Sequence, residues 1–423
     1  MSVFLEKTKH IFTDTTLRKK ILFVIFALIL FRLGANIPIP GVDFVRLEEF
    51  FSGNTFLGLL NVFSGGGLSN LSIFMLGVGP YITASIIMQL ATMIFPQLRE
   101  MYHEEGALGR QKFSAYTRYL TVPLAIVQGF SLLALLRNNG VLIELTPFEQ
   151  VFNIILVTAG SMLLMWIGEL ISEYGIGNGV SLIIFAGIVA GLPGILSQLI
   201  FTFNAAQIPL YLGFLIVSLL IVAGIVVITE AERPIPITYA KRVKGMKVYG
   251  GVSTYLPLRV NQAGVIPIIF ALSFLLFPQI IVNFFAASTN PIIEVIVRGL
   301  TFFISNLWLY GGFYFLLVFA FTYFYTAVTF DPDAISSNLQ KSGAFVPGVR
   351  PGQSTSQYIA KILTRITLVG ALFLGFVAVL PFIMQAVTGN PALAIGGTGL
   401  LIVVSVVLDL VKKIDGQLSM REY

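Results

Sequence analysis

The chain has 423 residues, of which 56% are hydrophobic and only 11% are charged, whereas soluble domains carry roughly a quarter charged residues. With no cysteine and only two histidines, His10 and His103, it offers neither disulfides nor a thiolate or histidine-rich metal site. This composition excludes an ordinary soluble domain and predicts an all-α polytopic membrane protein. The net charge of +6 is less informative than the positions of the basic residues along the chain.

Long apolar runs predict ten membrane-spanning helices, because a bilayer core takes about 20 apolar residues per helix. In chain order the predicted spans are 21–38, 72–97, 119–136, 151–168, 177–196, 208–228, 263–284, 303–328, 366–386 and 394–411. Ten spans can divide into two five-helix halves, residues 1–205 and 206–423. An odd number of spans per half inserts the halves in opposite senses, as in an inverted repeat.

The Lys and Arg residues orient these spans. All but four of the 26 fall on one side, and the exceptions are Arg32, Arg46, Arg137 and Arg298. Because basic residues favour the cytoplasm, both termini and the long loops 229–262 and 329–365 are predicted to be cytoplasmic.

The sequence lacks the signatures of an enzyme. It contains no GxxxxGK[ST] phosphate loop, and "GIGNG" at 175–179 has neither the GxGxxG spacing nor a preceding strand. The pair Glu104 and Glu105 is expected in a solvated loop, and no nucleophile lies beside a base. We therefore expect no catalytic residue, no metal and no cofactor.

The predicted spans keep charged residues away from the middle of the bilayer. Glu169, Glu230 and Asp409 lie at span ends, and Arg32 lies near the end of the first span. Ion-coupled transporters usually place such groups inside their spans. A secondary transporter of a small solute is therefore the weaker alternative, and a scaffold without transport is a third.

Two basic loops are candidates for docking a partner. In 229–262, the alternation of Ile235, Ile237 and Tyr239 predicts a short strand or hairpin. In "SGAFVPGVRPG" at 342–352, prolines and glycines stiffen a turn that presents Arg350. Basic tips of this kind suit RNA phosphates or an acidic protein.

A half-length apolar segment precedes the second span. Its large apolar residues recur at the spacing of one helix face: Phe56, Leu59, Leu60 and Phe63. Three glycines at 65–67 end this helix, which over 55–64 would measure about 15 Å, half of the hydrocarbon thickness. Irregular backbone at membrane depth must be enclosed by protein or line a cavity. The segment is therefore either a surface helix or a re-entrant piece.

Six stretches are similar, in order and spacing, to motifs of the SecY family of protein-translocation channel subunits. They are "LNVFSGGGLSNLSIFMLGVGPYITASIIMQL" (60–90), "GIGNGVSLIIFAGIVAGLP" (175–193), "YAKRV" (239–243), "AGVIPIIF" (263–270), "GAFVPGVRPG" (343–352) and "GGTGLLIVV" (396–404). The resemblance covers essentially the whole chain. It implies ten helices in two inverted halves around a central hourglass pore, with a short external plug helix.

Matched motif by motif, the resemblance implies a role for individual residues. A constriction of aliphatic side chains would comprise Val78, Ile82, Val180, Ile184, Ile269 and Ile402. A plug at about 60–71 would include Asn61, Phe63, Ser64, Gly65, Gly66, Gly67 and Leu68. The docking residues for a motor or ribosome would be Lys241, Arg242 and Arg350. A lateral gate would separate spans two and three from spans seven and eight.

The resemblance also implies the partners and the function. The expected partners are the SecE and SecG subunits, the SecA motor ATPase, the ribosome, signal peptides, unfolded preproteins and the lipid bilayer. The chain would be a protein-conducting channel in the bacterial cytoplasmic membrane, moving secretory polypeptides across it and releasing membrane-protein segments sideways. The hydrolysis of nucleotide would belong to the partner and not to this chain.

Overall fold

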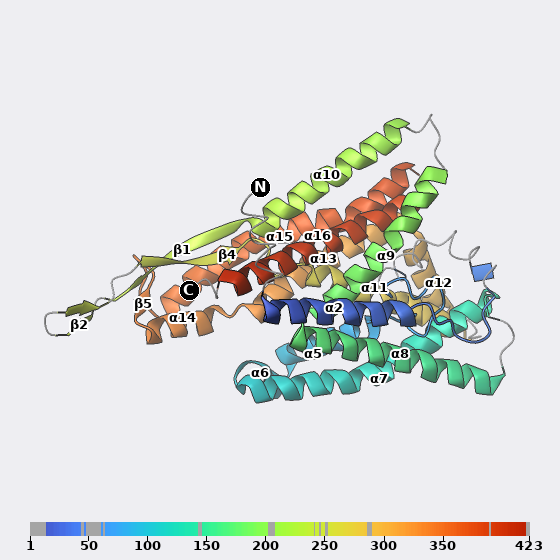
Figure 1. Cartoon of the computed structure of the whole chain (residues 1–423), viewed down its shortest axis with the longest axis horizontal. Coiled ribbons are helices and arrows are strands. Elements are labelled where there is room, and N and C mark those ends of the chain that lie inside the picture. The colour runs from blue at the N-terminus through green and yellow to red at the C-terminus, as the bar shows by residue number, and fades with distance from the viewer. Residues whose placement is uncertain are drawn as a thin grey trace.

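The computed structural model describes residues 14–43, 46–47, 61, 64–142, 146–201, 208–240, 242–244, 247–249, 253–285, 290–388 and 391–419. Long helices lie side by side in one bundle, and a small group of strands projects from one end of it (Figure 1). We call this end the strand side. It corresponds to the side that the basic residues predict to be cytoplasmic.

Each predicted span falls on a helix. These helices are α2 (Thr15–Gly34), α5 (Gly79–Ile94), α7 (Gly106–Asn138), α8 (Pro147–Tyr174), α9 (Gly179–Phe201), α10 (Ile208–Glu230), α11 (Ile266–Phe285), α13 (Leu307–Thr329), α15 (Gln353–Thr388) and α16 (Pro391–Ser419). Among the described residues, five are long and apolar enough to cross a membrane alone, or six if α5 and α6 (Pro96–His103) form one bent span. Helix α2 is not among them because it carries four basic residues, Arg18, Lys19, Lys20 and Arg32.

The second span begins later than predicted. Residues 64–77 form a series of turns, α5 starts only at Gly79, and the chain bends by 114° between α5 and α6. Gly65, Gly66 and Gly77 have φ angles of 66°, 83° and 58°, a region that glycine enters without steric cost. The prediction of a helix from residue 72 was therefore wrong at its start, because apolar composition does not reveal these turns.

The turn segment lies inside the protein. Ser64, Leu68, Leu71, Phe74 and Met75 are each at most 2% exposed. Such enclosure is what irregular backbone at membrane depth requires, and it favours the re-entrant interpretation over a surface helix. Of the predicted plug, Asn61 and residues 64–71 are described, whereas Phe63 lies outside the described residues.

The predicted hairpin is present on the strand side. Strand β1 (Glu232–Tyr239) pairs antiparallel with β4 (Ser253–Arg259) and with β5 (Ala344–Phe345), and β2 (Arg242–Lys244) pairs with β3 (Lys247–Tyr249). Ile235 and Ile237 are buried, whereas Tyr239, the third residue of the predicted alternation, ends the strand and is exposed. Ile235 belongs to a small apolar core that also includes Leu258, Val346 and Ile359.

The second half contains more helix than the sequence predicts. The region 329–365 is not simply a loop, because α14 (Pro332–Lys341) lies within it and α15 already begins at Gln353. Asp331 caps α14 by accepting hydrogen bonds from the backbone N–H groups of the first turn. Before α13, α12 (Pro291–Ser305) lies at the end of the bundle opposite the strands (Figure 1).

Candidate functional site

The six aliphatic residues predicted for the constriction lie in one contiguous apolar cluster. They come from the start of α5 and from α9, α11 and α16. Val78, Ile184 and Ile402 are fully buried, Ile82 and Ile269 are 3% and 5% exposed, and Val180 is partly buried. Four helices that are distant in the sequence therefore meet at these side chains.

Helices α9 and α16 pack against each other and define a sequence of layers. They run in opposite directions, since α9 starts and α16 ends on the strand side (Figure 1). A Cβ on Gly399 would lie 3.0 Å from the Ile188 side chain. Ile184 lies one turn from Ile188 on α9, and Ile402 lies one turn from Gly399 on α16, in both cases toward the strand side. The two buried isoleucines therefore lie at about the same level of the bundle.

The predicted plug, of which Asn61 and residues 64–71 are described and are called the plug segment below, rests directly on this layer. A Cβ built on Gly187 would fall 2.0 Å from the Cα of Gly65, so the two glycine backbones touch. Gly187 lies one turn beyond Ile184 on the same face of α9. On another side, a Cβ on Gly65 would fall 2.3 Å from the ring of Phe31 on α2. The turn at Gly65 is thus enclosed between α2 and α9, on the side of Ile184 away from the strands.

Hydrogen bonds within the plug segment keep its turn compact. The Ser64 hydroxyl accepts from the Leu68 N–H (2.9 Å) and donates to the Asn61 carbonyl (3.0 Å). The Asn61 side chain accepts from the Ser69 N–H at 2.8 Å, and the Ser69 hydroxyl donates to the Gly66 carbonyl at 2.8 Å. These side chains satisfy backbone groups that a helix or sheet would otherwise satisfy.

The plug segment is also tied to α2 by a charged side chain. Arg32 donates from Nη1 to the carbonyl oxygen of Gly65 at 3.1 Å. Our sequence reasoning did not identify Arg32, Phe31 or Gly187 as partners of the plug. For Arg32 a signal existed, since it is a basic residue in an apolar span, on the side that holds few basic residues.

A cavity opens on the strand side of the apolar layer. It has a volume of about 450 Å³, and Ile82, Val180 and Ile269 supply part of its apolar wall. Polar residues complete the lining, among them Ser85, Gln89, Ser114, Arg118, Glu169, Ser172, Glu173 and Ser181. Arg118 and Glu169 form an ion pair of 2.8 Å between α7 and α8. The cluster therefore separates a polar cavity from the plug segment.

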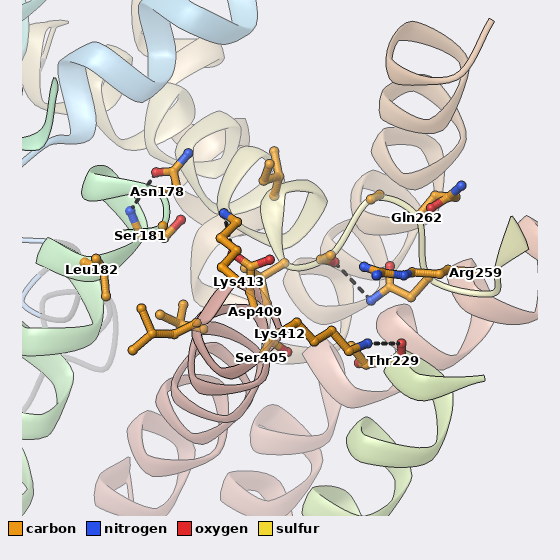
Figure 2. A pocket seen from close by; sticks show the side chains of 18 of the residues that line it. Asn178, Ser181, Leu182, Thr229, Arg259, Gln262, Ser405, Asp409, Lys412 and Lys413 are labelled. Carbon is orange, nitrogen blue, oxygen red and sulfur yellow. Dashed lines mark hydrogen bonds and ion pairs between the residues drawn. The ribbon is translucent and has the colours of Figure 1, made fainter. Parts of the chain in front are cut away.

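A second cavity of about 310 Å³ adjoins the first and shares Asn178, Ser181, Ile266 and Tyr325 with it. Figure 2 shows Asp409, Lys412 and Lys413 reaching it from α16, with Asn178 and Ser181 on the other side. Lys412 pairs with Glu230 at 2.9 Å and donates to the Thr229 carbonyl at 3.3 Å, and Lys413 pairs with Asp409 at 2.8 Å. The charges at these span ends thus neutralise one another.

Of the helices predicted to form the lateral gate, α11 (span seven) packs against α5 and α7 (spans two and three), whereas α13 (span eight) packs against α11. The Ser131 hydroxyl on α7 donates to the Ile280 carbonyl on α11 at 3.4 Å. Beside it, the rings of Phe130 and Phe284 meet edge to face with centroids 5.7 Å apart. The hydrogen bond at Ser131 is long, and the Phe130–Phe284 ring contact is apolar, so neither contact ties the two helices by a charge.

Arg350 lies on a stiff turn on the strand side. Gly348 and Gly352 have φ angles of 81° and 93°, and the Arg350 carbonyl accepts a hydrogen bond from the Thr355 hydroxyl at 2.8 Å. The Arg350 side chain is exposed and makes no ion pair with any residue that the structure describes. Of the other predicted docking residues, Arg242 belongs to β2, and Lys241 lies outside the described residues.

Comparisons with known proteins identify relatives over the whole chain. The family model described as SecY matches residues 72–411. A protein translocase subunit SecY from Mycobacterium bovis is 42% identical over 96% of both chains, and one from Streptomyces coelicolor is 43% identical over 97% of both. A third, from Halalkalibacterium halodurans, is 42% identical over 98% of this chain and 97% of its own.

Solved structures share the fold at lower sequence identity. A structure described as a protein-conducting channel has a TM-score of 0.63 at 19% identity, and covers 95% of this chain and 93% of its own. Sec61 in a canine ribosome–channel complex has a TM-score of 0.59 at 18% identity, with the same coverage. A SecY structure, whose plug domain is reported to stabilise the closed channel, has a TM-score of 0.62 at 20% identity, over 95% and 93%.

Proposed function

This chain belongs to the SecY family, and on that premise we propose that it forms a protein-conducting channel for unfolded polypeptides. A polypeptide would enter the cavity on the strand side, part the apolar layer and displace the plug segment. Aliphatic side chains suit this task because they donate no hydrogen bonds, exclude water when closed and deform around many sequences.

The order of the layers along the bundle is the observation that carries the proposal. A polar cavity, an apolar layer containing Ile184 and Ile402, and an enclosed plug segment at Gly65 follow one another. Polar coordination at the middle of the bundle would favour a small-solute transporter, but this position holds buried aliphatic side chains. In the proposed closed state, both the layer and the plug resist ion flow.

We propose that two halves, residues 1–205 and 206–423, move apart about this layer. The seam between α5 and α7 on one side and α11 and α13 on the other would then open toward lipid. Signal peptides would bind at the opened seam, and membrane-protein segments would leave through it into the bilayer. The uncharged contacts at Ser131 and Phe130 support this assignment.

The driving energy would come from partners. The exposed Arg350, together with Lys241 and Arg242, would dock the SecA motor ATPase or the ribosome on the strand side. The ribosome-bound relative Sec61 supports the ribosome as a partner. SecE and SecG would complete the complex in the bacterial cytoplasmic membrane, with both termini of this chain in the cytoplasm.

A cross-linking experiment tests the path of the polypeptide. Because the chain contains no cysteine, Ile184→Cys provides a single reactive thiol in the buried layer. Ile155→Cys is the matched control, since Ile155 is 62% exposed on the outer surface of α8. A preprotein that is arrested during translocation and carries one cysteine should cross-link to residue 184 and not to residue 155. The proposed path would be excluded if residue 184 did not cross-link, or if residues 184 and 155 cross-linked equally.

A further inference from the structure

The last turn of α2 contacts the plug segment through Arg32. Its Nη1 donates to the Gly65 carbonyl at 3.1 Å, and a Cβ on Gly66 would lie 3.4 Å from the same nitrogen. The guanidinium group therefore lies against the turn formed by Gly65 and Gly66. Both glycines have positive φ angles, and this conformation directs the Gly65 carbonyl toward α2.

The residues that directly follow α2 contact the other end of the plug turn. Asn36 donates from Nδ2 to the Arg32 carbonyl at 2.8 Å. Its Oδ1 accepts a hydrogen bond of 3.1 Å from Asn70 Nδ2, which also lies 3.4 Å from the Ala35 carbonyl. Arg32 thus connects to Gly65 through its side chain and to Asn70 through its backbone and Asn36.

The bond from the charged Arg32 side chain to the Gly65 carbonyl is expected to be stronger than the neutral bond between Asn36 and Asn70. Hydrogen bonds from an ionised donor are roughly twice as strong as neutral ones. No ion pair of Arg32 occurs among the residues that the structure describes, so the Gly65 carbonyl is a principal partner of this partly buried cation. Displacement of the plug segment would break this bond and leave the partly buried guanidinium group without it.

We propose that Arg32 is a positioning residue that holds the plug segment in the closed position. The inference rests on the proposed role of the segment as a plug and adds the side chain that retains it. Loss of the guanidinium group then raises the fraction of channels with a displaced plug, without changing the apolar layer itself.

The chain supplies a matched control in Arg46. Its Nη1 donates to the carbonyl of Gly140, another glycine with positive φ, at 3.3 Å. Gly140 follows the end of α7 and is not part of the plug segment. Arg46→Gln therefore removes a charged donor to a glycine carbonyl, together with the 3.6 Å ion pair between Arg46 and Asp43, from a site that does not hold the plug.

Thiol labelling measures the position of the plug directly. Leu68→Cys places a fully buried thiol in the segment, and a membrane-impermeant maleimide is applied to reconstituted full-length channels from the side opposite the strands. Adding Arg32→Gln should raise the labelling rate about tenfold, the change that 1.4 kcal/mol produces. Arg32→Lys, which retains a charged donor, should label at an intermediate rate, and Arg46→Gln should label at the parent rate.

Three results would overturn the proposal. The first is an unchanged labelling rate in Arg32→Gln, and the second is an equal increase in Arg46→Gln. The third applies if Arg32→Gln does not fold: it is a parent-like labelling rate in the double variant Arg32→Lys, Asn36→Ala. Labelling needs no translocating substrate, so its outcome is separate from that of the cross-linking test at residue 184.

Discussion

Gly187 on α9 and Gly65 in the plug segment are in direct backbone contact, and a methyl group on Gly187 would fall 2.0 Å from the Gly65 Cα. Nothing flexible lies between the two residues, so one of the backbones must move if Gly187 gains a side chain. Helix α9 also carries the buried Ile184, whereas the plug segment is a set of turns. We therefore expect the plug segment to move.

The first prediction is that Gly187→Ala makes the resting channel leak ions. Overpacking of this kind costs about 1–3 kcal/mol, which corresponds to a rise of about 5- to 150-fold in the ratio of displaced to closed channels. Conductance of the purified channel in planar bilayers measures it. Gly191→Ala on the same helix is the control, because, apart from its own helix backbone and chain neighbours, no atom of a described residue lies within 4 Å of a Cβ there. Equal conductance in the two variants would contradict the prediction.

The second prediction concerns the seam. Cysteines at Phe130 and Phe284, joined by a short cleavable thiol cross-linker, should block preprotein export, and cleavage of the linker should restore it. The control pair, Phe315 and Phe376, has a similar ring separation of 5.6 Å but joins α13 to α15 within one half. Cross-linking of this control pair should leave export unchanged. Full export with the first pair joined would mean that this seam does not open.

The third prediction is that Arg350→Glu abolishes motor-driven export while the amount of folded protein stays constant. The side chain is exposed and makes no ion pair with a described residue, so its reversal removes no described internal contact. Lys341→Glu makes the same change of charge at an exposed position on neighbouring α14 and should retain most export. Similar losses in both variants would indicate general charge repulsion rather than a specific contact.

The fourth prediction concerns the backbone just before α5. The Ser161 hydroxyl donates to the buried Gly77 carbonyl at 2.9 Å. Ser161→Ala leaves that carbonyl without this donor, which costs about 1–3 kcal/mol. The variant should unfold at a lower temperature in a thermal melt. Thr301→Ala, which removes an exposed hydrogen bond within α12, should change the melting temperature little.

Much of the fold could be predicted because its signals are local. Apolar runs marked all ten long helices, and the alternation of Ile235 and Ile237 marked the hairpin. The start of α5 could not be predicted in this way. Residues 72–77 are apolar enough for a span, but a Cβ on Gly160 would fall 2.0 Å from the Ile73 carbonyl. A contact between residues so distant in sequence leaves no mark in local composition.

In the candidate site, too, some residues could be assigned from the sequence and others only from the structure. The aliphatic residues of the layer were assigned by family resemblance, since an isoleucine in a span is most often packed or lipid-facing. Arg32 is an exception to the distribution of basic residues, and its place beside Gly65 emerges only in three dimensions. Gly187 is one of 40 glycines in the chain, and nothing local distinguishes it from Gly191.

The continuity of α15 has a mechanical consequence. The helix starts three residues after Arg350 and runs for 36 residues, a length of about 54 Å. Its start is fastened to the Arg350 turn by Thr355, and the Ser336 hydroxyl on α14 bonds the Gly352 carbonyl at 2.6 Å. A load applied at Arg350 would therefore pass directly into α15, whose backbone is uninterrupted by proline as far as Pro381. We expect work done there by a partner to move the helix from Gln353 to Leu380 as one piece, with Pro381 as the point at which it can bend.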